Sequence, residues 1–201
     1  MRKFQWVFVA LALICISLTA RGLAADASDS GVAVGSKAPD FTLQNQDGAN
    51  VNLHDFAGKI VVLEWTNPNC PFVLRHYQAK TMQTLAGQFK DVTWLAINSS
   101  ATASNAADKQ WATDQAIPYP VLNDVATTVG KAYHATNTPE MFIIGADGTL
   151  LYKGAIDNDP TGDKTTGKIN YVQQALTEIL AGKSVSVPET KPYGCHVVYR
   201  D

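Results

Sequence analysis

Residues 59–66 restrict the fold more than any other segment of the chain. They read Lys-Ile-Val-Val-Leu-Glu-Trp-Thr, a β-rich run that is apolar on both faces apart from one acid. A strand of this kind lies inside a sheet that is covered on both sides, as parallel sheets of α/β proteins are. Residues 67–69 break the run, and Pro71 then suits the first turn of a helix. These residues predict a buried strand that leads directly into a helix.

Strands and helices alternate along the rest of the chain. Asp147-Gly148, between two apolar runs, is a strong hairpin signal. Strands are expected at residues 38–43, 49–53, 92–98, 121–122, 141–144 and 150–153. Helices are expected at residues 70–89, 105–115, 124–133 and 170–181. This order predicts an α/β domain with a central mixed β-sheet flanked by helices, an N-terminal hairpin and an extended C-terminal tail.

The first 25 residues have the pattern of a signal peptide. Arg2 and Lys3 form a positive start, residues 6–18 are almost continuously apolar, and the small residues within 22–25 suit cleavage. An uncleaved single-helix anchor is the alternative, and it would be the one part of the chain in a membrane. We expect an exported protein, periplasmic or secreted. The expected divisions are a signal peptide at 1–25, a flexible leader at 26–36, a folded domain at 37–183 and a C-terminal tail at 184–201.

The composition excludes several classes of protein. With 46% hydrophobic residues among 201, the chain is too apolar for intrinsic disorder. Its 16 basic and 18 acidic residues give a net charge of -2 without a basic cluster, which disfavours a nucleic-acid partner. It has no repeated long apolar runs, so it is not a polytopic membrane protein.

Cysteine usage indicates one redox pair. Of the three cysteines, Cys15 lies in the predicted signal peptide, so the mature chain keeps Cys70 and Cys195. Export would place both where disulfides persist. Two thiols are too few for a disulfide scaffold, but they suffice for one redox couple.

Cys70 stands where the buried strand ends and the helix begins. Ligands of open α/β sheets bind at that end of the strands. The first turn of a helix offers free N–H groups and a positive dipole end, which can lower a cysteine pKa from about 8.5 to between about 3.5 and 7.5. Thr66, Asn67 and Asn69 are further expected hydrogen-bond partners of a thiolate. The alternative is an inert, packed cysteine.

Glu64 and the Thr138-Pro139 step are two further unusual features of the sequence. Glu64 lies inside the most hydrophobic strand, where an ionised, unpaired carboxylate costs several kcal/mol, so it is expected to titrate high or to have a partner. Such an acid beneath a thiol could exchange a proton with it. The alternative is an outward-facing or ion-paired Glu64. Thr138-Pro139 precedes an apolar strand, as an ordinary strand entry or as a cis peptide.

The chain resembles the redoxin and alkyl-hydroperoxide-reductase/thiol-specific-antioxidant group over about residues 37–182. The resemblance implies the thioredoxin fold, with Cys70 as nucleophile, Pro139 as the cis-proline facing it, and Glu64 where thioredoxins carry their buried acid. The tail around Cys195 looks like a peroxiredoxin-like subgroup. The residues that carry the likeness are Ala38-Pro39-Asp40-Phe41-Thr42-Leu43, Trp65-Thr66-Asn67-Pro68-Asn69-Cys70-Pro71, Tyr119-Pro120-Val121-Leu122, Thr138-Pro139 and Thr190-Lys191-Pro192-Tyr193-Gly194-Cys195.

The sequence departs from the group at three positions. Val73 stands where thioredoxins have their second cysteine, so no local disulfide forms. Asn67 and Leu63 stand where peroxiredoxins carry a hydroxyl residue and a proline. The substrate therefore stays open between a peroxide and a disulfide.

Cys195 is the candidate resolving thiol, because a lone attacking thiolate leaves a sulfenic acid or mixed disulfide behind. It lies in a tail bounded by Pro188, Pro192 and Gly194, which could fold back over the active site. The resulting disulfide would form within one chain or between two. The alternatives are a static structural disulfide and a free tail thiol.

Other polar residues are candidates for an electrostatic role or for metal binding. Arg75 is a candidate electrostatic helper, whereas His76 lies about 240° around the helix from Cys70. Cys70, Cys195, His76 and His196 lack close ligand spacing, so we predict no metal site. Residues 157–163 contain three aspartates, but Lys168 stands where a calcium loop ends in an acid, so a solvated loop is expected.

Together these features favour an exported thiol oxidoreductase without a cofactor. Cys70 would attack a peroxide or disulfide substrate, Cys195 would resolve the product, and a thiol reductant protein or small dithiol would reset the pair. Supporting or substrate-binding positions are expected at Thr66, Asn67, Asn69, Pro71, Arg75 and Thr138. The alternative is a non-enzymatic thiol-based binding module, such as a copper chaperone or a redox-sensing adaptor.

Overall fold

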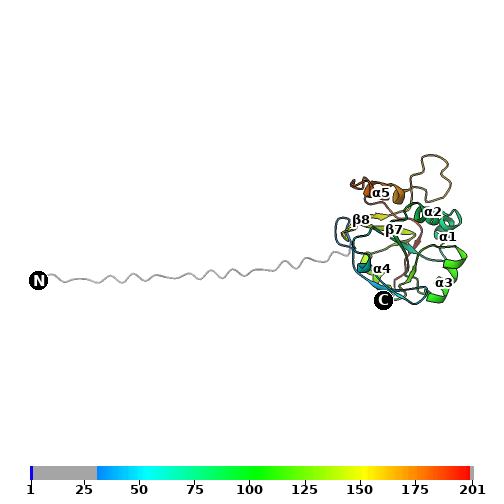
Figure 1. The fold of residues 1–201 in the computed structure, drawn as a ribbon, viewed down its shortest axis with the longest axis horizontal. Coiled ribbons are helices and arrows are strands. Elements are labelled where there is room, and N and C mark those ends of the chain that lie inside the picture. Colours follow the sequence, from blue (N-terminus) through cyan, green and yellow to red (C-terminus); the bar gives the residue numbers. More distant parts are fainter. Residues whose placement is uncertain (2–30, 200–201) are drawn as a thin grey trace.

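A computed structural model of the chain describes Met1 and residues 31–199 (Figure 1). The predicted signal peptide after Met1, the leader up to residue 30 and the last two residues lie outside the described residues. No helix among those described has the length and apolarity needed to span a membrane.

A seven-stranded mixed sheet forms the centre of the domain, in the order β2-β1-β5-β4-β3-β7-β8. Strand β3 runs parallel to β4 and antiparallel to β7, and β4 runs parallel to β5. A second, two-stranded sheet pairs β6 with β9. The strands are β1 Thr42–Asn45, β2 Asn50–Asn52, β3 Val61–Thr66, β4 Thr93–Asn98, β5 Val121–Asn123, β6 Asn137–Thr138, β7 Glu140–Ile144, β8 Leu150–Gly154 and β9 Cys195–His196.

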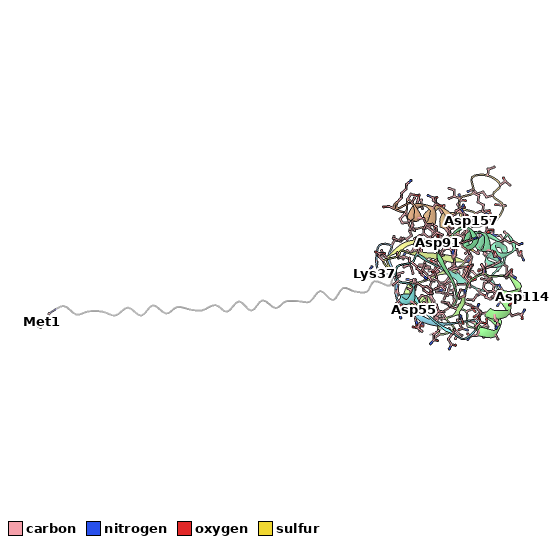
Figure 2. The ribbon with its side chains drawn as sticks, viewed as in Figure 1. Met1, Lys37, Asp55, Asp91, Asp114 and Asp157 are labelled. Atoms are coloured by element: carbon pink, nitrogen blue, oxygen red, sulfur yellow. The ribbon has the colours of Figure 1, made fainter. Side chains whose placement is uncertain are left out.

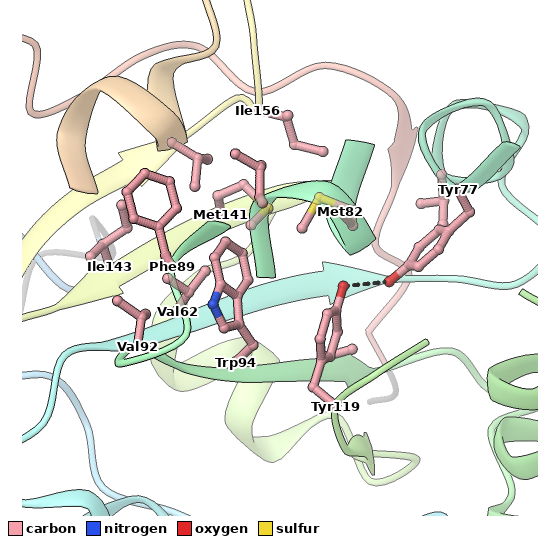
Figure 3. Close-up of a cluster of buried hydrophobic side chains, with 14 of the residues drawn as sticks. Val62, Tyr77, Met82, Phe89, Val92, Trp94, Tyr119, Met141, Ile143 and Ile156 are labelled. Atoms are coloured by element: carbon pink, nitrogen blue, oxygen red, sulfur yellow. Dashed lines mark hydrogen bonds between the residues drawn. The ribbon is translucent and has the colours of Figure 1, made fainter. Parts of the chain in front are cut away.

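Helices and an N-terminal segment cover the two faces of the large sheet. Residues of α1, α2, α3 and α5 pack with Val62 and Met141 in one core, part of which is shown in Figure 3. Residues of α4 pack with Trp65 and Phe142 in the other core. The helices are α1 Pro71–Gln78, α2 Thr81–Gln88, α3 Asn105–Asp114, α4 Thr128–Tyr133 and α5 Tyr171–Leu180, with a 3₁₀ helix η1 at Leu53–Phe56. Strand β3 is buried along its whole length, as its sequence predicts.

The single helix expected at residues 70–89 is wrong, because the chain breaks it into α1 and α2. Lys80 adopts a left-handed conformation with φ 56° between them. Tyr77 and Met82 are both buried in the same core. On one continuous helix they would point about 140° apart. The break allows both side chains to reach one core.

Two other boundaries differ from expectation. The first strand begins at Thr42 rather than at residue 38, and Pro39, which has no N–H to donate to a ladder, precedes it. Helix α4 begins at Thr128, four residues after the expected cap Asp124. The Asp124 carboxylate nevertheless accepts hydrogen bonds from the N–H groups of Val129 and Gly130 in the first turn.

Candidate active site

Cys70 occupies the N-cap position of α1, directly after β3 and its following turn. Its N–H donates to Asn67 O at 3.0 Å, which closes the turn, and Pro71 fills the first helical position as predicted. The residue is 1% exposed. The expected strand-to-helix junction is therefore present, and the cysteine in it is covered.

The segment around Pro139 lies against the Cys70 sulfur. The Thr138-Pro139 peptide bond is cis. The Cys70 thiol donates a hydrogen bond to Thr138 O at 3.0 Å. Thr138 belongs to β6, so the sulfur meets the backbone of a short strand from a distant part of the chain.

The C-terminal tail brings Cys195 to the same place. Strand β9 pairs antiparallel with β6, and in this register Cys195 lies opposite Thr138. Cys195 is half-buried, and both cysteines are free thiols. Cys195 packs against the core cluster that contains Cys70. The fold thus places the two cysteines of the predicted redox pair in contact within one chain.

The pKa values of the two thiols shift in opposite directions. Burial alone would raise the pKa of Cys70, but its interactions with Cys195 and Thr138 and with the N–H groups of Val73 and Cys195 outweigh burial, so this pKa is lowered. Burial and the hydrogen bond to Cys70 raise the pKa of Cys195 to about 11. Cys70 is therefore the thiol of the pair that ionises first, and Cys195 is the one that keeps its proton.

The other expected partners of the sulfur act elsewhere. The Asn67 side chain accepts from the N–H of Asn69 and so shapes the turn. Thr66 is buried at the end of β3, and its hydroxyl has no hydrogen-bond partner among the described residues. Neither asparagine nor Thr66 is among the groups that shift the pKa of Cys70. The stabilising contacts come from the tail and from β6 instead.

Glu64 lies in a buried cage of tyrosines. It accepts hydrogen bonds from Tyr77 at 2.7 Å and from Tyr119 at 2.9 Å. The two phenol oxygens lie 3.0 Å apart, and Figure 3 shows the hydrogen bond between them. Burial raises the pKa of Glu64 to about 7, although both hydrogen bonds oppose the shift. The expected high titration and the expected partner are both present. Tyr77 belongs to α1, so this carboxyl ties the helix after Cys70 to the strand before it.

Arg75 faces a loop rather than the sulfur. Its guanidinium donates to Asp159 O and Pro160 O in the segment after β8, and it lies over the rings of Phe72 and Tyr193. It is not among the groups that shift the pKa of Cys70. Its observed contacts are with the tail and the loop that support the site.

A buried polar network anchors the tail beside Arg75. The Tyr193 phenol donates to Asp157 at 2.5 Å and lies 2.9 Å from Nε2 of His76. Burial lowers the pKa of His76 to about 4, so the imidazole is neutral at pH 7 and its Nε2–H donates to the phenol. The network joins α1, the loop after β8 and the tail. The sequence alone does not predict it.

The expectation of a solvated loop at residues 157–163 is wrong for two of its three aspartates. Asp157, which is labelled in Figure 2, is 1% exposed. Asp159 is 2% exposed. Lys168 pairs with both carboxylates, at 3.2 Å and 3.0 Å. The lysine that argued against a calcium loop instead neutralises the buried acids.

Glu140 is a further buried acid that sequence reasoning missed. One of its oxygens accepts from the N–H groups of Thr136 and Asn137 and from the Thr136 hydroxyl. It thereby holds the turn that leads into Thr138. An acid at the start of an apolar strand, directly after Pro139, is the same signal that singled out Glu64.

A cavity of about 230 Å³ reaches Thr138 and His196, the neighbours of the two cysteines, although neither cysteine lines it. It opens between the ends of β3 and β4, β6 and the tail. No Asp, Glu, Lys or Arg lines it. The lining residues are Trp65, Thr66, Asn67, Ser99, Ser100, Ala101, Thr102, Thr138, His196, Val197 and Val198. Within the described part of the chain, no cluster of three or more His, Cys, Asp or Glu residues is arranged to hold a metal ion.

The family model described as the AhpC/TSA family matches residues 34–153, which include β1, Cys70, Pro139 and most of the sheet. The chain belongs to the AhpC/TSA family. Its mixed sheet flanked by helices is the thioredoxin-like fold that the sequence predicted. The family model ends before α5 and the tail, so Cys195 and Tyr193 lie outside the matched region.

One curated protein and two solved structures resemble the chain over most of its length. The thiol-disulfide oxidoreductase ResA of Bacillus subtilis (strain 168) is 24% identical over 155 residues, which cover 75% of this chain and 86% of ResA. An uncharacterized conserved protein of Geobacillus kaustophilus has a solved structure with a TM-score of 0.73 and 29% identity, covering 84% of this chain and 93% of that one. A hypothetical protein of Sinorhizobium meliloti 1021 has a TM-score of 0.74 and 24% identity, covering 85% and 96%.

Proposed function

We propose that this protein is an exported thiol-dependent oxidoreductase, in which Cys70 is the nucleophilic thiolate and Cys195 is the resolving thiol of the same chain. The observation that carries the proposal is the β6–β9 pairing, which sets Cys195 opposite Thr138, whose carbonyl oxygen accepts a hydrogen bond from the Cys70 thiol at 3.0 Å. The lowered pKa of Cys70 supports it. Family membership and the similarity to ResA support thiol chemistry. Export is proposed on the pattern of residues 1–25.

The first half of the reaction oxidises the pair. With a hydroperoxide, the Cys70 thiolate attacks one peroxide oxygen, the O–O bond breaks, and the products are a Cys70 sulfenic acid and, after protonation, an alcohol or water. The Cys195 sulfur then attacks the sulfenic sulfur, its proton joins the departing hydroxide, and water leaves. The result is a Cys70–Cys195 disulfide.

A disulfide substrate reaches the same product. The Cys70 thiolate attacks one sulfur of the substrate, which releases the other sulfur as a thiolate and leaves a mixed disulfide. Cys195 attacks the Cys70 sulfur of that bond, gives up its proton and releases the second substrate thiol. The substrate gains two electrons, and the pair loses two.

The second half of the reaction restores the dithiol. A reductant thiolate, from a thiol reductant protein or a small dithiol, attacks the Cys195 sulfur, which is more exposed than that of Cys70. Cys70 leaves as the thiolate, because a thiol with a lowered pKa is the better leaving group. The second thiol of the donor then attacks the donor sulfur of the mixed disulfide and Cys195 is released as a thiol. The donor leaves as its own disulfide, having given two electrons to the pair.

The neighbouring residues hold this geometry. Thr138 and Pro139 place a backbone carbonyl oxygen and a side chain against the sulfur. Glu64 fixes α1 relative to β3 through Tyr77, and proton exchange between Glu64 and the thiol remains a prediction. Arg75 supports the ring of Tyr193 in the tail.

The test combines turnover with a map of the oxidised protein. Wild type should consume a hydroperoxide or a small disulfide with a dithiol donor, and peptide mapping should show a Cys70–Cys195 crosslink within monomeric protein. C70S should lose both. C195S should accumulate a Cys70 sulfenic acid or mixed disulfide and turn over slowly. Two free thiols after oxidant treatment would reject the proposal, as would copper retention that needs both cysteines and occurs without turnover.

A further inference from the structure

The tail from residue 188 to residue 199, here called the strap, fills an edge where another chain would otherwise bind. Its strand β9 pairs with β6, and Val197 N donates to Thr136 O just beyond that pair. Asn137 Nδ2 also donates to Gly194 O. An open strand edge is where an extended peptide adds to a sheet, and at β6 the strap already takes the hydrogen bonds that a peptide would use.

The strap is fitted to this edge at the level of its backbone. Gly194 has φ 119°, and a Cβ at this position would clash with the carbonyl oxygen of Thr138. A Cβ at Gly154 would clash in the same way with the backbone of Thr190. Two glycines thus allow close approach at two points of the strap. This close fit leaves no room for a second peptide between the strap and Cys70.

Three side chains fasten the strap at separate points. Thr190 shares a hydrogen bond with Tyr152 and accepts from the N–H of Ala155. Tyr193 joins Asp157 and His76. Tyr199 donates to the carbonyl oxygens of Gly130 and Ala135. Because these anchors lie on both sides of Cys195, the strap holds this residue from both directions.

A small cavity lies next to the residue that contacts the Cys70 sulfur. Cys70 is 1% exposed, while the 230 Å³ cavity reaches Thr138, the residue that accepts its hydrogen bond. Such a volume corresponds to about seven or eight water molecules, which is below the range of pockets for drug-sized ligands. The cavity has apolar walls from Trp65 and Val197, and no charged carboxylate or ammonium lines it.

We infer that the strap acts as a steric filter, which restricts Cys70 to small uncharged oxidants that enter through the cavity and excludes protein disulfides until the strap lifts. This inference rests on the proposed function for its chemistry, but its structural content is the selective accessibility of one sulfur. The Tyr193 hydroxyl is the positioning group that keeps the filter closed, because it joins the strap to two other elements.

The experiment measures access to Cys70 without redox turnover. In C195S protein prepared without residues 1–25, which contain Cys15, only Cys70 can react. Its alkylation is followed with iodoacetamide and with the same electrophile carried on a 5-kDa polyethylene glycol. Rates are divided by those of the unfolded protein. Iodoacetate, equally small but charged, serves as a third reagent. The intact strap should slow the polymer reagent at least about tenfold relative to iodoacetamide, and iodoacetate should also react more slowly.

Release of the strap should then remove the size selection. C195S/Y193F loses two hydrogen bonds of the anchor and should raise the polymer rate about tenfold, with a much smaller effect on iodoacetamide. C195S/Y171F is the matched control and should change neither rate, because no hydrogen bond of the Tyr171 phenol ties it to the strap. C195S/Y199F opens the other anchor and provides a second release variant. Equal normalised rates for the two reagents with the strap intact, or no gain in either release variant, would overturn the inference.

Turnover separates this inference from the proposed function. Wild type should use a small hydroperoxide or neutral small disulfide but not a protein disulfide, and Y193F should gain the protein substrate. Size-selective labelling without any turnover would reject the oxidoreductase and keep the filter. Turnover of a protein disulfide by wild type, at a rate comparable with that of the small substrate, would reject the filter and keep the oxidoreductase.

Discussion

Cys195 lies opposite Thr138 in the β6–β9 pair, and the carbonyl oxygen of Thr138 accepts from the Cys70 thiol. The interaction between the two cysteines lowers the pKa of Cys70 while it raises that of Cys195. The fold therefore assigns different chemical states to two identical side chains. C195A should raise the pKa of Cys70, because the thiolate loses a donor. The measurement is the rate of iodoacetamide alkylation of Cys70 against pH.

The matched variant for this prediction is C195S, whose hydroxyl can still donate. It should raise the pKa of Cys70 less than C195A does. An alkylation midpoint in C195A that equals or lies below that of wild type would show that Cys195 does not stabilise the thiolate.

Glu64 should make the protein less stable as the pH rises. Its pKa is about 7 in the folded chain against 4.5 for the ordinary group, so above pH 4.5 the unfolded chain releases a proton that the folded chain retains. Stability therefore falls between pH 4.5 and about 7, by roughly 3 kcal/mol in total. E64Q lacks this titration, so its stability relative to wild type should increase over that range.

Urea unfolding at pH 5 and pH 8 measures this difference. Subtracting wild type from E64Q cancels His76, whose lowered pKa changes stability in the opposite direction. E178Q is a suitable control, since Glu178 lies on the exposed side of α5 and its pKa is lowered by contacts with Ser186. Parallel curves for E64Q and wild type would contradict the buried, proton-retaining carboxyl.

Glu140 should stabilise the turn that carries Thr138. E140A would leave the N–H groups of Thr136 and of the buried Asn137 without their acceptor, which should cost about 2 to 4 kcal/mol in urea unfolding. E140Q keeps one oxygen and should recover part of that loss. E189A, which removes an exposed acid paired with Lys153, is expected to change stability by less than about 1 kcal/mol. Equal effects of E140A and E189A would remove Glu140 from this role.

Gly194 should control how fast the internal disulfide forms. In G194A, the new methyl group would clash with Thr138 O and push β9 away from β6. Overpacking of this kind costs about 1 to 3 kcal/mol, so disulfide formation after an oxidant pulse should slow about tenfold. Loss of two thiols per chain, followed by mass spectrometry, gives the rate.

The control for Gly194 is G182A. Gly182 also has a positive φ, but nothing lies within 4 Å of its added Cβ, so this variant carries the backbone strain without the clash. Similar disulfide rates in G194A and wild type would show that close backbone packing at Thr138 is unnecessary.

The parts of the fold that the sequence predicts are those whose signals are local. Strand β3 is apolar on both faces, and Asp147-Gly148 lies between two strand-like runs, so pattern and turn chemistry suffice. The break at Lys80 has no such signal, since neither glycine nor proline occurs there. It arises because Tyr77 and Met82 share one core, which is a tertiary requirement.

The same distinction applies to the candidate site. Cys70 and Glu64 stand out because each is an unusual residue type within a strongly patterned segment. His76, Asp157 and Tyr193 are ordinary polar residues far apart in the chain, and only the folded tail brings them together. Asp157 and Asp159 look solvated in sequence because their partner Lys168 is several residues away and their burial depends on the strap and α1.

The position of the strap in the sequence has a consequence for biosynthesis. Cys195 is made 125 residues after Cys70, when every strand of the large sheet has already been synthesised. Domains begin to fold from their N-terminal parts during synthesis. A nascent chain thus passes through a stage in which the strap does not yet cover Cys70. Mixed disulfides with other thiols should therefore be found on ribosome-bound or newly translocated chains.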